Sequence, residues 1–277
     1  MPTRSSLKLD RPPNRNNTNH SQPACNHTAT SNRLTVSENE SATKTEQARR
    51  VREMFAAIAA RYDLLNHLLS GNVDKRWRRL VAKTIYQGLP RGTGRVLDVA
   101  CGTGDLSLTL SEGGHAKIVG VDFCRPMLDI AASKSLKRDA RIPFIEGDAL
   151  ALPFSDSSFD GATIAFGLRN LASVESGLAE LRRVLKPGGR LAVLEFSKPR
   201  FAIFRGLFKV YFTKLLPIVG GLISGSRGAY QYLPDSVSRF PDQKELSALM
   251  TKAGFEEVTY KNLTGGIAAL HTGRRPQ

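Results

Sequence analysis

The stretch that most constrains the fold of this chain is LDVACGTGD, which runs from Leu97 to Asp105. An apolar run from Arg95 to Val99 has the length of a buried strand, and Gly102-Thr103-Gly104 follows it closely. Glycine lets the backbone turn sharply and leaves room for a ligand beside the main chain. Apolar residues at helical spacing begin after Asp105, so the stretch predicts a strand, a tight turn and a helix. Doubly wound α/β folds bind nucleotides at such a turn, outside the carboxyl end of the first strand.

Strand-like and helix-like segments alternate along the chain after this turn. This alternation predicts an α/β fold with a parallel sheet that helices cover on both faces. We place a turn at Lys186–Gly189, where Pro and two Gly residues end a helix. The remaining predicted strands are Lys117–Asp122, Ile142–Glu146, Phe159–Phe166, Arg190–Phe196 and a final pair, Glu256–Asn262 and Gly266–Thr272; the predicted helices are Pro126–Lys137, Val174–Leu185 and Asp242–Ala253.

The chain changes in character near residue 45. Residues 1–44 are rich in Asn, Ser, Thr and Pro and show no periodicity, which predicts a disordered N-terminal tail without a secretory signal. Residues 45–277 are expected to form one domain. Two amphipathic helices precede its first strand, because apolar residues recur at three- and four-residue steps. The apolar positions are Val51, Met54, Phe55, Ile58, Leu64, Leu65, Leu68 and Leu69 in the first region, and Trp77, Leu80, Val81 and Ile85 within Asp74–Tyr86 in the second.

Residues 201–240 are expected to form a helical insertion. Its first part, up to residue 225, is aromatic and aliphatic, and Arg205, Lys209 and Lys214 lie at four- and five-residue steps. The longest uncharged run, Leu215–Ser226, has 12 residues, whereas about 20 are needed to span a bilayer. The pattern fits either a lid that packs over the site or a helix that lies in a membrane interface.

The net charge of +15 and the isoelectric point near 10.1 indicate an anionic partner, either nucleic acid or an anionic membrane surface. The three cysteines form no CxxC pair and no histidine stands at metal-ligand spacing. We therefore expect a reducing, cytoplasmic setting and no bound metal. The sequence leaves open whether the chain forms a homodimer.

The residues around the turn distinguish between possible nucleotides. A dinucleotide site would have GxGxxG, but the third glycine is missing here. The Asp105 carboxylate would also face the pyrophosphate of a dinucleotide, where a helix N-terminus should offer N–H groups and positive charge. Both features disfavour NAD. S-adenosylmethionine (SAM) carries an ammonium and a sulfonium, which Asp98 and Asp105 can offset while the backbone of Gly102 and Gly104 accepts the amino-acid moiety. Asp122 ends the second strand and can bind both ribose hydroxyls.

The third strand is also followed by an acid. Asp148 can accept a hydrogen bond from the adenine amino group, and Ala149 can supply backbone atoms. Acids after strands are often only helix caps or turn formers. Three of them at successive strand ends, beside a glycine turn, favour a SAM site.

Four segments together resemble the UbiE-type quinone C-methyltransferases of ubiquinone and menaquinone biosynthesis, and the resemblance extends from about Thr45 to the C-terminus. It implies a class I SAM-dependent methyltransferase fold: a Rossmann-like, mostly parallel sheet of seven strands with an antiparallel last strand and helices on both faces. The segments are Tyr62–Asn66 with Ser70 and Trp77, FGLRN at Phe166–Asn170, RVLKPGGRLAVLEFS at Arg183–Ser197, and Tyr230–Leu246.

The resemblance also implies site residues. In that family the cofactor contacts match Thr103, Asp122, Asp148 and Ala149 of this chain. Some members use a serine just before FGLRN, where this chain has Ala165. We expect Arg169 to orient a water molecule or to stabilise a phenolate, with Tyr230, Tyr232 and His67 as further catalytic candidates.

The implied reaction is transfer of a methyl group from SAM to a ring carbon of a polyprenylated quinol. Our first choice of substrate is demethylmenaquinol, and the alternative is the benzoquinol of the ubiquinone route. An RNA or other small-molecule methyltransferase and a non-catalytic SAM-binding module are rival hypotheses. FGLRN contains neither the Pro-Pro-aromatic clamp of amino-group methylation nor the Pro-Cys nucleophile of pyrimidine methylation, so we expect no nucleic-acid partner. A long isoprenoid tail would require the enzyme to work at the inner face of a membrane, as a peripheral protein.

Overall fold

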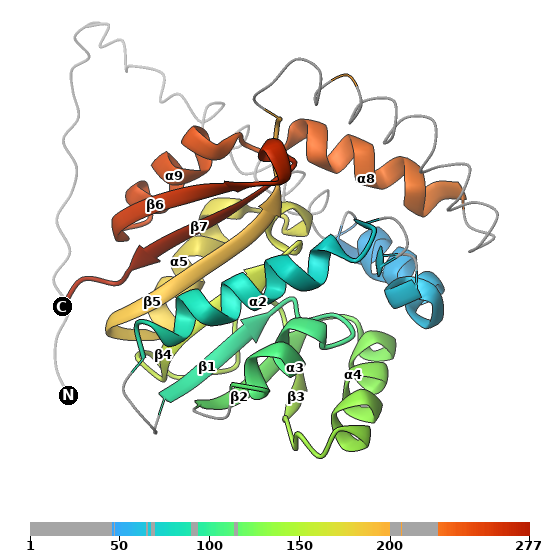
Figure 1. Cartoon of the computed structure of the whole chain (residues 1–277), viewed down its shortest axis with the longest axis horizontal. Helices are drawn as coiled ribbons and strands as arrows, with labels where there is room; N and C mark the ends of the chain where they lie inside the picture. The colour runs from blue at the N-terminus through green and yellow to red at the C-terminus, as the bar shows by residue number, and fades with distance from the viewer. Residues whose placement is uncertain are drawn as a thin grey trace, which may run out of the picture. The chain divides into compact units, whose positions relative to one another are not determined.

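A seven-stranded sheet in the order β3-β2-β1-β4-β5-β7-β6 forms the centre of the molecule (Figure 1). The computed structural model describes residues 46, 48–64, 66–67, 70–89, 94–113, 116–199, 206 and 227–277. The predictions for residues 1–44, for Leu65, Leu68 and Leu69, and for most of residues 201–226 lie outside this part. The strands are β1 Gly94–Val99, β2 Ala116–Asp122, β3 Phe144–Glu146, β4 Phe159–Ala165, β5 Leu185–Phe196, β6 Glu256–Leu263 and β7 Ala268–Arg274.

The strand directions confirm the predicted mixed sheet. β1 pairs in parallel with β2 and β4, and β2 with β3 and β4 with β5 in the same way. β7 enters between β5 and β6 and pairs antiparallel with both. The order reverses at β1, with β2 on one side and β4 on the other, so a crevice opens beyond the carboxyl ends of these strands.

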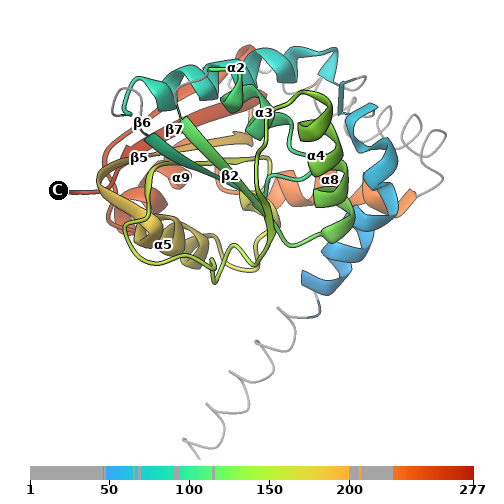
Figure 2. The same ribbon diagram turned by 90° about the horizontal axis from the view of Figure 1, so that it is seen from below.

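Helices cover both faces of the sheet, as Figure 2 shows, with α2 and α3 on one side and α5 and α9 on the other. Each face has its own apolar core: Trp77, Val81 and Leu110 belong to one, and Leu178 and Met250 to the other. The parallel strands β1, β2 and β4 between them are buried on both sides over most of their length, as expected for a parallel sheet. The helices are α2 Val73–Tyr86, α3 Asp105–Ser111, α4 Arg125–Lys137, α5 Val174–Val184, α8 Arg227–Arg239 and α9 Gln243–Lys252.

Local sequence signals set several helix ends. Ser173 caps α5 by accepting a hydrogen bond from Ser176 N, and Asp242 with Glu245 forms a capping box at α9. Pro126 lies in the first turn of α4, where its missing N–H is tolerated. Residues 48–64 are helical, as predicted. No helix within the described ranges is long and apolar enough to cross a bilayer.

The prediction that a turn at Lys186–Gly189 separates a helix from a strand is wrong. β5 begins at Leu185, directly after α5, and Leu185 pairs with Phe159. The next residues to pair are Arg190 and Gly161, so the intervening residues bulge out of the ladder. Gly188 has φ +74°, which allows the bulge. The third strand is also shorter than expected and begins at Phe144, because the N–H of Ile142 donates to the Ser135 hydroxyl instead.

Candidate active site

Two adjoining hollows lie at the carboxyl ends of β1, β2 and β4. We call them the Arg169 hollow and the Asp148 hollow. Both are lined by Phe55, Tyr62, Ala100, Gly102, Ala165 and Phe166. Asp98, Trp77 and Arg169 line only the first, and Asp122, Asp148 and Ala149 line only the second. The predicted cofactor residues that line these hollows are therefore gathered where the strand order reverses.

The glycine turn has the geometry that only glycine adopts easily. Gly102 and Gly104 have φ values of +55° and +80°. A Cβ on Gly104 would lie 2.9 Å from the Ala131 Cβ, whereas a Cβ on Gly102 would meet no described atom within 4 Å. Gly104 is thus required for the packing of α3 against α4, while Gly102 faces open space at the hollows.

Asp122 and Asp148 both hold the backbone near the Asp148 hollow. The buried Asp122 carboxylate accepts hydrogen bonds from Gly102 N at 2.8 Å and Cys124 N at 2.9 Å. Burial raises the pKa of Asp122, although these backbone donors oppose the shift. Asp148 Oδ1 accepts from Leu150 N at 2.8 Å, so it forms a turn as well as lining the hollow. Each carboxylate keeps further lone pairs for a ligand.

Asp98 is buried at the end of β1 and lines the Arg169 hollow. Its two carboxylate oxygens accept from the hydroxyls of Ser107 at 2.6 Å and Thr163 at 2.9 Å. Burial raises the pKa of Asp98 to about 6, even though both hydroxyls lower it. A cation in the hollow would favour the charged form of this group.

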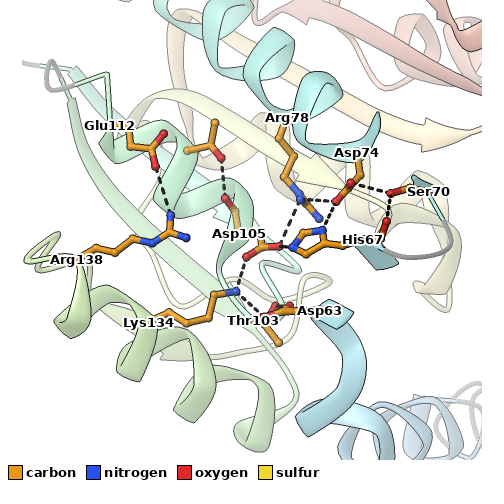
Figure 3. Close-up of polar contacts among 11 residues, drawn as sticks. Asp63, His67, Ser70, Asp74, Arg78, Thr103, Asp105, Glu112, Lys134 and Arg138 are labelled. Carbon is orange, nitrogen blue, oxygen red and sulfur yellow. Dashed lines mark hydrogen bonds and ion pairs between the residues drawn. The ribbon is translucent and has the colours of Figure 1, made fainter. Parts of the chain in front are cut away.

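Asp63 lines neither hollow but contacts the glycine turn beside them, and the sequence analysis did not single it out. It comes from the helical segment 48–64 and accepts from the Thr103 hydroxyl at 2.5 Å and from Lys134 Nζ at 2.8 Å (Figure 3). Lys134, on α4, also pairs with Asp105 at the start of α3. Thr103 is a predicted cofactor contact, but its hydroxyl holds the N-terminal segment against the glycine turn. Tyr62-Asp63 belongs to a segment that entered the sequence analysis only through the family resemblance.

Asp105 belongs to a second group of contacts on the α2 side of the same network (Figure 3). Arg78 Nη1 lies 3.3 Å from Asp105 and 2.7 Å from Asp74. Burial raises the pKa of Asp105, but the charges of Arg78 and Lys134 outweigh it and lower the value overall. The Asp105 carboxylate, which we expected to offset a positive charge of the cofactor, is therefore also paired with Arg78 and Lys134.

His67 lies in this network. Its Nδ1 is 2.9 Å from Asp74, and its Nε2 is 3.6 Å from Asp105. Ser70 donates to the other oxygen of Asp74 at 2.7 Å. His67 is not among the residues that line either hollow, so the geometry gives it a structural place between α2 and α3.

Arg169 and Glu195 bring two of the sequence motifs together. Arg169 Nη1 donates to Glu195 Oε1 at 2.7 Å and to Phe166 O at 2.5 Å. Burial raises the pKa of Glu195, and the Arg169 charge opposes that shift. The Arg169 guanidinium lies over the Phe196 ring, 5.4 Å from its centroid, and its buried Nε donates to no described residue. The side chain is thus fixed through Nη1, and its buried Nε is left without a described partner.

Three tyrosines, Tyr62, Tyr230 and Tyr232, are described by the structure to different extents. Tyr232 lines the Arg169 hollow, and its hydroxyl donates to Asn170 Oδ1 at 3.1 Å. Tyr230 lies in α8, but its side chain is outside the described part of the structure. Tyr62 is partly buried and hydrogen-bonded to Asn66, and desolvation raises its pKa, so its hydroxyl stays neutral at pH 7. Within the described residues no group of three His, Cys, Asp or Glu side chains is placed to hold a metal ion; the absence of a metal stays a prediction.

The sheet order, the glycine turn and the hollow at the reversal of strand order define the class I SAM-dependent methyltransferase fold. Solved structures with this fold include a SAM-dependent methyltransferase, possibly acting on histamine, from Thermotoga maritima, with TM-score 0.56 and 24% identity over 80% of this chain and 99% of that one. The [4+2]-cyclase SpnF has TM-score 0.63 and 20% identity and covers 83% of this chain and 96% of its own. At such identities the likeness shows the fold alone.

The chain belongs to the ubiE/COQ5 methyltransferase family, whose model matches residues 42–275. It is 53% identical over 224 residues to the demethylmenaquinone methyltransferase of Thermus thermophilus, which covers 80% of this chain and 100% of the relative. It is 49% identical over 231 residues to the Deinococcus radiodurans protein of the same name, with 83% and 94% covered. A ubiquinone/menaquinone biosynthesis C-methyltransferase UbiE from Geobacter sulfurreducens is 46% identical over 235 residues, with 83% and 90% covered. The resemblance expected from the four sequence segments is confirmed.

Proposed function

We propose that this chain uses SAM to methylate a ring carbon of a polyprenylated quinol, with demethylmenaquinol as the substrate. The relatives named demethylmenaquinone methyltransferase, at 53% and 49% identity, support this choice of substrate. The observation that carries the chemistry is Arg169: a guanidinium whose Nε has no described partner lies in a hollow whose walls are mainly apolar and aromatic.

The residues of the two hollows fit SAM. Gly102 leaves open space where any other residue would place a Cβ, which suits a ligand lying against the turn. Asp122 would hold the ribose hydroxyls, Asp148 with Ala149 the adenine, and Asp98 would face the positively charged end. SAM supplies an electrophilic methyl group on a positively charged sulfur when it is bound.

The Arg169 hollow fits a flat aromatic ring. Phe55, Trp77, Phe166 and Phe196 provide apolar surface that excludes water. Removing a phenolic proton from a quinol puts negative charge on the adjacent ring carbon, which makes that carbon the methyl acceptor. Arg169 would stabilise the phenolate or orient a water that accepts the proton.

Glu195 and the Tyr232–Asn170 hydrogen bond support Arg169 on two sides of the hollow. The Glu195 carboxylate fixes the guanidinium by accepting from Nη1 and, at 3.4 Å, from Arg169 N. Tyr232 reaches from α8 to the residue next to Arg169. Closing the hollow with α8 would hold the ring in place, and such positioning is a large part of what methyl transfer requires. Tyr230 remains a candidate from the sequence.

The benzoquinol of ubiquinone biosynthesis is the second candidate substrate. It is favoured by relatives named ubiquinone/menaquinone biosynthesis C-methyltransferase UbiE, at 46% identity and below. We place the enzyme in the cytoplasm, bound peripherally to the inner face of an anionic membrane, because a polyprenylated quinol is held in the bilayer and the chain carries a net charge of +15.

The test combines a cell experiment with an assay of the purified protein. Quinones extracted from cells that lack this protein should accumulate demethylated menaquinone, and an unchanged quinone pool would overturn the proposal. The purified protein should transfer labelled methyl from SAM to a short-tailed demethylmenaquinol faster than to a short-tailed benzoquinol. Labelling of bulk RNA would favour the RNA methyltransferase, and SAM binding without turnover on either quinol would favour a binding module.

A further inference from the structure

Four cations occupy the outer side of α2. Lys75, Arg76, Arg79 and Lys83 are all exposed, and none of them forms an ion pair in the part of the chain that the structure describes. At about 100° per residue these positions fall within an arc of about 100° on the helix. They therefore form one continuous strip, which we call the basic face.

The other side of α2 is buried. Trp77, Val81 and Ile85 pack into the core beneath the sheet face that α2 covers. Figure 2 shows α2 at the outer edge of the described part of the chain, with the sheet on one side of it only. The basic face is thus directed away from the sheet.

The same helix forms part of the wall of the Arg169 hollow. Asp74, Trp77 and Arg78, at the N-terminal end of α2, line that hollow. The basic face begins on the same turns, at Lys75 and Arg76. A surface that binds the basic face would therefore lie close to the proposed quinol site.

We propose that the basic face of α2 docks the protein on an anionic phospholipid membrane. This inference rests on the proposed function, because a quinol with a long isoprenoid tail is delivered from the bilayer. Clusters of four or more Lys and Arg on an amphipathic helix bind anionic lipid by charge complementarity. Within residues 75–83, all of which are described, no exposed aromatic side chain lies between the four cations, so the face lacks the stacking surface of single-stranded nucleic-acid sites.

The test uses the full-length protein and two variants of equal net charge. One variant carries Lys75→Gln, Arg76→Gln, Arg79→Gln and Lys83→Gln on the basic face. The matched control removes four exposed lysines from β2, α4, α9 and β6, none of which forms an ion pair within the described residues. The control substitutions are Lys117→Gln, Lys137→Gln, Lys244→Gln and Lys261→Gln.

Binding to phosphatidylglycerol-containing vesicles is measured by sedimentation. Each cation near the surface contributes about fivefold in partitioning, or about 1 kcal/mol. The basic-face variant should therefore bind at least about 100-fold more weakly, whereas the control should stay within about fivefold of the wild type. Binding of the wild type should weaken as salt is added, because the contact is electrostatic.

Three outcomes would overturn the docking surface: equal loss in both variants, wild-type protein that does not bind the vesicles, and binding of RNA that is stronger than binding of the vesicles and depends on the basic face. Melting temperature and SAM affinity of both variants are measured to establish that they fold. Turnover of a short-tailed quinol without vesicles should be the same in the basic-face variant and the wild type. A wild type that docks through this face but methylates no quinol would refute the proposed function and leave the surface in place.

Discussion

Arg169 Nη1 and Glu195 Oε1 lie 2.7 Å apart, with side chains that are 6% and 1% exposed. Arg169 follows β4 in FGLRN, and Glu195 lies near the end of β5, the parallel neighbour of β4. The pairing of these strands therefore places the two motifs at one wall of the hollow. Because both charges are buried, each depends on the other for its stability.

Replacing Glu195 should reveal this dependence. Glu195→Gln leaves a buried guanidinium without a carboxylate, which typically costs about 3 kcal/mol of unfolding free energy. Denaturant unfolding measures the loss. The control is Glu257→Gln, since Glu257 is 67% exposed and its ion pair with Arg274 is at the surface; its change should be below about 0.5 kcal/mol. Equal losses in both variants would contradict a buried, interdependent pair.

Replacing Arg169 separates positioning from charge. Arg169→Lys keeps a cation but loses the planar group that contacts Glu195 and Phe166 together. We expect the rate of methyl transfer to a quinol to fall about 100-fold, while SAM affinity changes less than about threefold, because Arg169 does not line the Asp148 hollow.

The matched control for this experiment is Arg182→Lys on α5, whose side chain donates to Gly254 O, away from both hollows. It should leave both the rate and the affinity unchanged. A normal rate in Arg169→Lys would show that the reaction needs only a positive charge at this position.

Asp98 should make stability depend on pH. Its pKa is about 6 in the folded protein and about 3.9 in an unfolded chain. Its contribution to stability is thus fully present below about pH 4 and is lost as pH rises through 6. Asp98→Asn removes this dependence, so the variant should gain about 1 kcal/mol relative to the wild type between pH 5 and pH 7.5.

The affinity for SAM should rise with pH, whereas the contribution of Asp98 to stability falls. A bound cation favours the ionised form of Asp98, so wild-type affinity for SAM should fall as pH drops below about 6. Asp98→Asn should bind SAM more weakly at pH 7.5 and lose most of the pH dependence. Calorimetric titrations across this range measure both effects, and parallel profiles for the two proteins would rule out Asp98 as the responsible group.

The Asp63 contacts predict an effect on cofactor exchange. Asp63→Asn weakens the bonds to Thr103 and Lys134 that hold segment 48–64 on the glycine turn. Because Asp63 is partly exposed, we expect SAM to bind about fivefold more weakly, mainly through faster dissociation. Stopped-flow measurements give the two rates. Asp129→Asn on α4, which breaks an exposed pair with Arg125, should have no effect on either rate.

Gly102 and Gly71 offer a test of whether SAM lies against the glycine turn. Their φ values are +55° and +57°, and at both glycines an added Cβ would have no described atom within 4 Å. Gly102→Ala and Gly71→Ala should therefore lose similar stability, about 1 kcal/mol. Only Gly102→Ala should abolish SAM binding, because its methyl group would occupy the ligand side of the turn. Unchanged SAM affinity in Gly102→Ala would place the cofactor elsewhere.

The sequence by itself determined the alternation of strands and helices, the glycine turn and the acids at the strand ends. Asp98, Asp122 and Asp148 could be assigned to strand ends because strand length and apolar pattern are local properties. The bulge in β5 was missed, since pairing of Leu185 with Phe159 depends on a partner strand. A local pattern contains no information about such a partner.

Tertiary structure alone decided which side chains meet. Asp63 reaches Thr103 and Lys134 across 40 and 71 residues of chain, and Arg169 finds Glu195 across 26. These pairs form because the packing of segment 48–64 and the order of the sheet bring distant residues to one place. Buried charges such as Arg169 and Glu195 are compensated only there, which is why periodicity and spacing in the sequence could identify the acids at the strand ends but not the tertiary partners of the site residues.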